Sequence, residues 1–300
     1  MTRPWIVLLA ALSLSGSGRH ATLDEITPVG EIQKVQTGFS FTEGPAPDGD
    51  GNLYFTDIPK NRIHRLSPSG ELSVFLEESQ RCNGLMVDGR GRLIACQGGA
   101  GRVIAIDLKT KEITVLADKY NGKRFLAPND LTLDRQGGIY FTDPRFGAGA
   151  NAQETEAVYY ISPSGEVTRL IDDLKQPNGI HLAPDEKTLY VLPTGTVGLF
   201  AYPVEAPGKL GKPRKFDVVS SGGDGMAVDT AGNLYLTQMS LSGVLVVSPE
   251  GKRLGLIKTP EIPANCVFGG ADFKTLYVTA RSSLYAIPMP VKGYHYLYSK

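Results

Sequence analysis

The sequence is poor in cysteine and histidine and shows no excess of charge, and each shortage excludes a class of protein. Three Cys in 300 residues cannot build a disulfide framework, and neither they nor the four His have zinc-site spacing. Thirty-one basic side chains are balanced by 31 acidic ones. Proteins that bind nucleic acid or anionic membranes by charge carry clusters of Lys and Arg. We therefore expect neither of these as a partner.

Long apolar runs are also missing, apart from one near the N-terminus. Arg3 precedes the apolar residues 6–14, and the small residues Ser15, Gly16, Ser17 and Gly18 follow them. This order is typical of a signal peptide. We predict a signal peptide over residues 1–21, with its cleavage site left open, and a periplasmic or secreted mature protein. A frayed apolar N-terminus of a cytosolic protein is the alternative. A membrane span needs about 20 apolar residues, so no span is expected.

Glycine and proline, by contrast, are plentiful. The chain has 35 Gly and 20 Pro, together with 41% hydrophobic and 21% charged residues. This composition is sufficient for a large core and excludes a disordered chain. Frequent turn residues imply short structural elements, which favours an all-β chain.

A short alternating sequence, typified by Leu-Tyr-Phe-Thr-Asp, occurs six times. The copies occupy residues 53–57, 93–97, 139–143, 189–193, 234–238 and 276–280, and successive copies begin 40–50 residues apart. Turns of the Asp-x-x-Gly kind precede several copies, and two further strand-like segments usually follow. This period is typical of β-propeller blades. The sequence therefore predicts one domain over residues 22–300, a six-bladed β-propeller with four antiparallel strands per blade.

The sixth copy ends early, because Pro288-Met289-Pro290 cannot continue a hydrogen-bonded ladder. An alternating stretch at residues 31–36 precedes the first copy and has no partner in sequence. We predict that this N-terminal strand supplies the outer strand of the last blade. The ring would then close without exposed strand edges.

One position of the repeat carries an oxygen-bearing side chain in every copy. It is occupied by Glu43, Asn83, Asn129, Asn178, Asp224 and Asn265. Equivalent positions of inner strands converge on the central channel of a propeller, and many oxygens around a small space suit a hard cation. We predict one divalent cation, with Ca²⁺ preferred and Mg²⁺, Mn²⁺ or Zn²⁺ as alternatives. These residues could instead form turns or bond the neighbouring blade.

These motifs resemble those of the SMP-30/gluconolactonase/luciferin-regenerating family. The segments concerned are Glu43-Gly44-Pro45, Pro128-Asn129-Asp130, Pro177-Asn178-Gly179, Asp224-Gly225-Met226 and residues 120–124 leading to 141–144. The resemblance implies a six-bladed propeller whose metal is held by Glu43, Asn178 and Asp224, with Asn129 close to the metal or substrate. It also implies hydrolysis of a sugar lactone or a related ester. One departure is Ala127, where several sugar-lactone hydrolases carry Arg.

A water nucleophile is expected, since no Gly-x-Ser-x-Gly elbow and no Cys–His pairing is present. Such a reaction needs a general base, for which we predict Asp224 first and Asp130 second. We assign substrate binding to Asn83, Asn129, Arg145 and Arg124.

Two rival functions remain open. A non-catalytic calcium-binding propeller would bind a small ligand or a protein partner on the same face, and some related propellers catalyse condensations. The specific lactone, the oligomeric state and the pairing of Cys82 with Cys96 also stay open.

Overall fold

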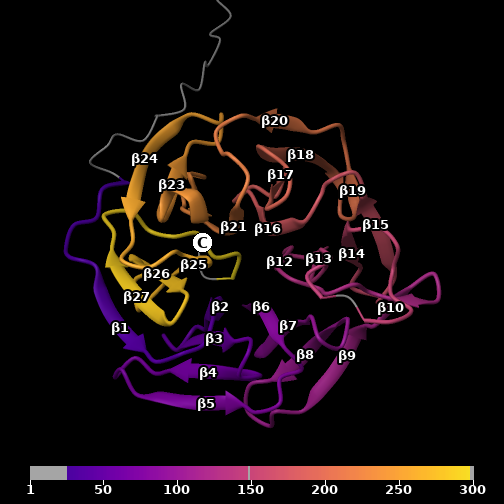
Figure 1. Cartoon of the computed structure of the whole chain (residues 1–300), viewed down its shortest axis with the longest axis horizontal. Helices are drawn as coiled ribbons and strands as arrows, with labels where there is room; N and C mark the ends of the chain where they lie inside the picture. Colours follow the sequence, from indigo (N-terminus) through magenta and orange to yellow (C-terminus); the bar gives the residue numbers. More distant parts are fainter. Residues whose placement is uncertain (1–25, 148, 298–300) are drawn as a thin grey trace, which may run out of the picture.

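The computed structural model describes residues 26–147 and 149–297, and strands make up nearly all of their regular structure. Six antiparallel sheets surround a central axis, and each sheet points one edge toward that axis (Figure 1). The six-bladed β-propeller predicted from the repeats is confirmed. A single 3₁₀ turn, η1 (Met239–Leu241), is the one helical element with assigned bounds in the described part.

The blades follow the order of the chain, each running from its inner strand outward. Blade 1 contains β2 (Thr42–Pro47), β3 (Leu53–Asp57), β4 (Arg62–Leu66) and β5 (Leu72–Leu76). Blade 2 contains β6 (Cys82–Val87), β7 (Arg92–Gln97), β8 (Arg102–Asp107) and β9 (Ile113–Ala117). Blade 3 contains β12 (Leu131–Leu133), β13 (Ile139–Asp143), β14 (Ala157–Ile161) and β15 (Val167–Ile171).

The remaining blades complete the ring. Blade 4 contains β16 (Pro177–Leu182), β17 (Thr188–Pro193) and β18 (Leu199–Ala206), and β18 also pairs with β19 (Lys209–Leu210) and β20 (Arg214–Phe216). Blade 5 contains β21 (Gly223–Val228), β22 (Leu234–Gln238), β23 (Gly243–Val247) and β24 (Arg253–Lys258). Blade 6 contains β25 (Asn265–Gly269), β26 (Thr275–Ala280), β27 (Ser283–Pro288) and β1 (Gln33–Thr37). A small hairpin of β10 (Lys119–Tyr120) and β11 (Lys123–Arg124) links blades 2 and 3.

Blade 6 is built from both ends of the chain. Strand β1 runs antiparallel to β27, with Gln33 opposite Ala286 and Thr37 opposite Ser283. The predicted closure of the ring by the N-terminal strand is therefore confirmed. Pairing the first strand with the last removes two sheet edges that would otherwise be open to other chains.

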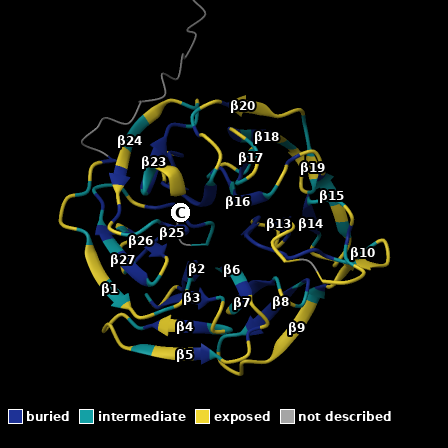
Figure 2. Cartoon of the chain, in the orientation of Figure 1, coloured by how far each residue is buried: buried dark blue, intermediate teal, exposed yellow. Residues whose placement is uncertain are grey.

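The core lies between adjacent blades. Tyr235 of β22 in blade 5 meets Phe268 of β25 in blade 6 edge-on at 4.9 Å between ring centroids. Phe141 and Tyr159 of blade 3 stack at 5.3 Å and belong to one cluster with Ile94 and Cys96 of blade 2. Inner and second strands are largely buried, whereas outer strands such as β9 and β1 are mostly exposed (Figure 2). The inner strands are thus held firmly on both faces, which fixes the side chains that reach the axis.

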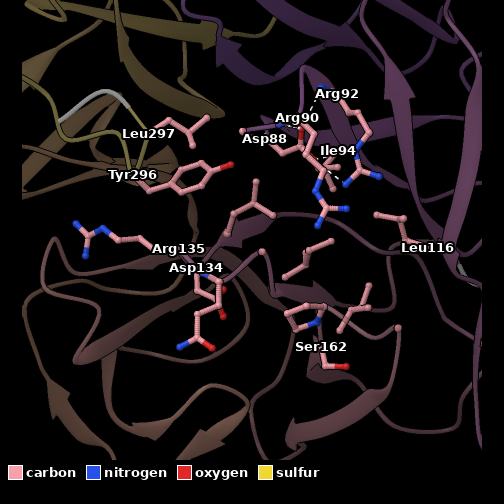
Figure 3. A pocket seen from close by; sticks show the side chains of 18 residues that line it. Asp88, Arg90, Arg92, Ile94, Leu116, Asp134, Arg135, Ser162, Tyr296 and Leu297 are labelled. Carbon is pink, nitrogen blue, oxygen red and sulfur yellow. Dashed lines mark hydrogen bonds and ion pairs between the residues drawn. The ribbon is translucent and has the colours of Figure 1, made fainter. Parts of the chain in front are cut away.

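The C-terminal tail, residues 289–297, runs to the centre of the ring (Figure 1), at the end of the channel where the inner strands β6 and β21 finish. The backbone N–H of Tyr294 donates to the carbonyl of Val228 in blade 5 at 2.8 Å, and Tyr296 Oη donates to the carbonyl of Val87 in blade 2 at 3.2 Å. Tyr296 and Leu297 also border a cavity of about 360 Å³ between blades 2 and 3 (Figure 3). The tail therefore closes this end of the channel.

All three cysteines, Cys82, Cys96 and Cys266, are buried free thiols, so Cys82 and Cys96 form no disulfide. In the part of the chain that is described, no helix has the length and apolar character needed to cross a membrane. The predicted signal peptide, residues 1–21, lies outside the described residues.

Candidate active site

The side chains that reach the axis come from interruptions in the inner strands. Strand pairing shifts register between Glu43 and Ala46, Cys82 and Leu85, Pro177 and Gly179, and Gly223 and Met226. Each interruption contains or borders a predicted site residue. A β-bulge redirects a side chain that regular alternation would place elsewhere, so one repeated irregularity brings four oxygen-bearing groups to the same end of the channel.

Glycine follows several of these residues because neighbouring inner strands approach closely. A Cβ atom on Gly44 would lie 1.9 Å from the carbonyl oxygen of Asn83 in the next blade. A Cβ atom on Gly225 would lie 2.0 Å from Oδ1 of Asn265. A Cβ atom would meet backbone at Gly44 and would force the Asn265 side chain to move at Gly225, so the Glu-Gly and Asp-Gly pairs reflect packing at the axis as well as turn formation.

A cavity of about 800 Å³ opens at this end of the channel, a size suited to a small-molecule ligand. Its polar lining includes Glu43, Asn83, Asn129, Asn178 and Asp224, five of the six residues predicted to converge. Its wall is mostly apolar and contains Phe41, Ile58, Pro59, Ala127, Pro128, Phe146 and Met239. The predicted oxygen cluster is therefore assembled at the floor of a substantial cavity.

Glu43 and Asp224 are buried carboxyl groups that face each other. Their exposed fractions are 3% and 8%. Burial raises the pKa of Glu43 to about 7, against the opposing effect of the Gly44 N–H, which donates to Oε2 at 2.8 Å. Burial and the neighbouring Glu43 raise the pKa of Asp224 well above its usual range, and the two carboxyl groups share a hydrogen bond. Without a cation, the pair therefore retains a proton.

Asn178 is anchored through its amide nitrogen. Nδ2 donates to Oδ1 of Asp224 at 2.7 Å and to Oγ1 of Thr194 at 3.0 Å. Thr194 in turn donates to the carbonyl of Gly223 at 2.7 Å. Because both amide hydrogens are used, the carboxamide oxygen of Asn178 is the atom left for a ligand.

The donor set fits a hard cation. Oδ1 of Asn83 is buried without a hydrogen-bond partner in the described structure, an arrangement that ordinarily costs about 1–3 kcal/mol. No cluster of three or more His, Cys, Asp and Glu side chains with metal-binding spacing occurs within residues 26–147 and 149–297. A cation at this floor would therefore be held by the carboxylates of Glu43 and Asp224 completed with Asn carboxamide oxygens, the ligand types of Ca²⁺.

Asp130 and Asn265 occupy a deeper layer of the channel. They line a separate cavity of about 50 Å³ together with His181 and the tail residues Tyr294 and His295. Nδ2 of Asn265 donates to Oδ2 of Asp130 at 3.4 Å, and burial and the nearby Glu43 raise the pKa of Asp130 to about 7. Asn265 thus lines the deeper cavity, and its side chain also hydrogen-bonds Glu43 of the floor, so it links the two layers. The role of Asp130 as a base stays a prediction.

Two arginines predicted to bind substrate lie outside the large cavity. Nη2 of Arg145 donates to the carbonyls of Gln153 and Glu154 at 3.2 and 2.7 Å. Nη2 of Arg124 donates to the carbonyl of Gly99 at 3.2 Å. Their substrate-binding roles remain predictions that the lining of the cavity does not support. The lining includes Arg81 instead, which sequence reasoning missed although it stands two positions before Asn83.

Comparison with known proteins assigns the chain to a family. The pattern described as SMP-30/gluconolactonase/LRE-like region matches residues 41–282. The chain belongs to this family. It is 32% identical over 294 residues to a gluconolactonase of Zymomonas mobilis, covering 87% of this chain and 81% of that protein.

Solved structures agree with this assignment of the family. A gluconolactonase from Xanthomonas campestris superposes with a TM-score of 0.84 at 32% identity, covering 90% of this chain and 93% of that chain. A calcium-binding regucalcin from Agrobacterium tumefaciens superposes with a TM-score of 0.77 at 22% identity, covering 92% and 98%. The second likeness is one of fold alone.

Proposed function

We propose that the protein is a divalent-metal-dependent hydrolase that opens the ring of a lactone, with sugar lactones as the substrate class. The observation that carries the proposal is the pair of buried carboxyl groups, Glu43 and Asp224, at the floor of the large cavity. At the level of a lactone-hydrolysing enzyme, the sequence-based prediction is confirmed by the relatives named gluconolactonase. The dependence on a cation is the part that requires experiment.

Glu43, Asp224 and the carboxamide oxygen of Asn178 would hold the cation, with Asn129 beside them. Two carboxylates balance a double positive charge, and the all-oxygen donor set favours Ca²⁺ over Zn²⁺, which prefers His and Cys. When bound, a dication supplies polarisation of the lactone carbonyl and stabilises negative charge that develops on its oxygen.

The protein's own groups position the substrate and handle the proton. Asp224 accepts the proton of the attacking water, and the 2.7 Å hydrogen bond from Asn178 holds its carboxylate in place. Asn83 and Asn129 present carboxamides to the ring or hydroxyl oxygens of the substrate from the cavity lining. Asp130, one layer deeper, is the second candidate for the base.

A panel of γ- and δ-lactones and aryl esters, assayed with and without chelator, tests this function. Turnover that chelation abolishes and Ca²⁺ restores supports a metal-dependent hydrolase. Tight binding of a ligand without turnover supports the non-catalytic alternative. Elemental analysis of the purified protein decides among Ca²⁺, Mg²⁺, Mn²⁺ and Zn²⁺.

We also propose that the protein is exported with removal of an N-terminal signal peptide, predicted over residues 1–21 with its cleavage site left open. N-terminal sequencing of protein recovered from a periplasmic or secreted fraction tests this. Recovery of the intact N-terminus in the cytosolic fraction would contradict it.

A further inference from the structure

Arg81 stands at the mouth of the large cavity on a tightly held segment of backbone. Its N–H donates to Oδ1 of Asn61 at 2.7 Å, and its carbonyl accepts from the N–H of Gly98 at 3.2 Å. Arg81 and Gln80 both adopt left-handed backbone, with φ of 55° and 58°. The same backbone recurs at Gln176, two positions before Asn178, where φ is 52°, so it belongs to the turn that precedes the inner strand.

The side chain of Arg81 lies against Gly99, and both residues line the cavity. A Cβ atom on Gly99 would lie 3.3 Å from both Cγ and Cδ of Arg81. The guanidinium has no hydrogen bond or ion pair with any residue that the structure describes. Arg62, in contrast, is paired with Glu77 at 2.8 Å, and Arg92 with Asp88 at 2.7 Å. The donors of Arg81 are therefore available to a ligand.

Charge in the cavity is distributed unevenly. Glu43, Asp224 and Arg81 are the ionisable side chains of its lining, and Arg81 is the exposed member of the three. With a dication at the floor, the two carboxylates are balanced and the guanidinium gives the cavity a net positive charge. Phe146 and Ile58 also line the cavity, and their apolar surface strengthens any charge interaction made beside them.

We propose that Arg81 determines specificity by binding an anionic substituent of the lactone substrate. A carboxylate, sulfonate or phosphate each offers the oxygen pair that a guanidinium binds through two parallel hydrogen bonds. The substrate class is thereby narrowed to lactones that carry a negative charge away from the ring ester. This inference rests on the proposed lactone hydrolysis.

Steady-state kinetics with a matched pair of substrates tests the assignment. The pair is the γ-lactone of gluconic acid, which is neutral, and the γ-lactone of glucaric acid, which keeps a free carboxylate. Arg81→Gln is expected to raise KM about 10- to 100-fold for the anionic lactone while leaving kinetics with the neutral lactone unchanged. Arg81→Lys keeps the positive charge but loses the two parallel donors of the guanidinium. Its KM for the anionic lactone should therefore lie between those of the wild-type protein and Arg81→Gln. Added salt should raise KM for the anionic lactone only when Arg81 is present.

Arg90→Gln is the matched control, because Arg90 is an exposed arginine beside the other cavity (Figure 3). It should leave both substrates unaffected. Equal losses on both lactones in Arg81→Gln, or no preference of the wild-type protein for the anionic lactone, would overturn the proposal. A variant in which only inhibition by the product gluconate changes would also overturn it, since Arg81 would then bind the product.

A binding experiment separates this proposal from the proposed function. If the wild-type protein hydrolyses neither lactone, lactone hydrolysis is wrong, and calorimetry with glucarate, a dianion, and with glucitol, a neutral polyol of the same length, then decides on Arg81. Glucarate binding that weakens about 10-fold in Arg81→Gln, with glucitol binding unchanged, supports an anion site. Equal binding of glucarate by the two proteins overturns it.

Discussion

Asn178 and Asp224 lie in adjacent blades, yet the carboxamide nitrogen of one donates to the carboxylate of the other at 2.7 Å. The bond ties the inner strands β16 and β21 together at the floor of the cavity. It also fixes which atoms face the cavity, because the amide hydrogens of Asn178 are used within the protein. The same contact therefore shapes both the blade interface and the proposed cation site.

Replacing Asp224 should weaken cation binding and slow lactone hydrolysis. Asp224→Asn keeps the shape of the side chain but removes one carboxylate, so affinity for the cation and the rate of lactone hydrolysis should both fall. Loss of a metal ligand and proton acceptor is expected to lower kcat at least about 100-fold. Lactonase assays with elemental analysis measure both effects. Full activity with bound metal in Asp224→Asn would show that the assignment is wrong.

Removing the cation should destabilise the folded protein. A ligand that binds only the native state raises the free energy of unfolding by about 2.7 kcal/mol at a concentration 100 times its Kd. Thermal unfolding with chelator should therefore start at a lower temperature than unfolding with Ca²⁺. Asp224→Asn provides the control, because Ca²⁺ should shift its midpoint much less. A wild-type midpoint that no divalent cation moves would argue against the site.

Gly225→Ala should destabilise the ring at the axis. The added Cβ atom would overlap Asn265, whose Cγ and Oδ1 both lie 2.0 Å away, and overpacking of this kind costs about 1–3 kcal/mol. Gly30→Ala is the control, because its nearest neighbour would be Pro288 Cγ at an ordinary 3.4 Å. Chemical denaturation of the two variants measures the difference. Equal stability would mean that the inner strands adjust more easily than their packing suggests.

The tail residue His295 should make the fold sensitive to acid. Burial lowers the pKa of His295 to about 3, below the usual histidine value near 6.5. Below about pH 6.5 the unfolded chain therefore binds a proton that the folded chain refuses, and the contribution of His295 to stability falls as the pH drops. Between pH 6.5 and pH 5 this contribution is about 2 kcal/mol.

The comparison is with His295→Phe, which keeps an aromatic ring beside Phe273 and Tyr296. The free energy of unfolding of His295→Phe minus that of the wild-type protein should rise as the pH is lowered from 7.5 to 5. Identical slopes for the two proteins would contradict the assignment of the buried neutral imidazole.

Much of the fold follows from local sequence. The strands β3 (Leu53–Asp57) and β13 (Ile139–Asp143) begin and end where the repeated sequence predicts, because alternation sets their faces and Asp-x-x-Gly turns set their starts. In the turn at residues 48–51, the carboxylate of Asp48 accepts from the N–H of Asp50 at 3.0 Å and from that of Asn52 at 2.8 Å. A turn that is stabilised by hydrogen bonds among its own residues can be predicted without knowledge of the tertiary structure.

The depth at which each polar side chain lies in the channel could not be predicted from the sequence. Asn129 and Asp130 are consecutive, but Asn129 lines the large cavity and Asp130 the small one beneath it. Similarly, Asn265 aligns with Glu43 in sequence and lies in the deeper layer. Interrupted strands break the alternation from which a side chain's direction is inferred. The closing of the channel by the tail was also invisible, since residues 289–297 carry no repeated pattern.

The pairing of β1 with β27 has a consequence for synthesis and engineering. The outer strand of blade 6, β1, is synthesised first, but its partner β27 is synthesised last. The ring can therefore close only after translation has passed residue 288. Contacts so distant along the chain are slow to form. A circular permutant would have new termini in an exposed loop and a linker joining the old ends. In it β27 and β1 would be close in sequence and could pair as a hairpin does. This permutant should refold faster than the wild-type protein, with the large cavity unchanged.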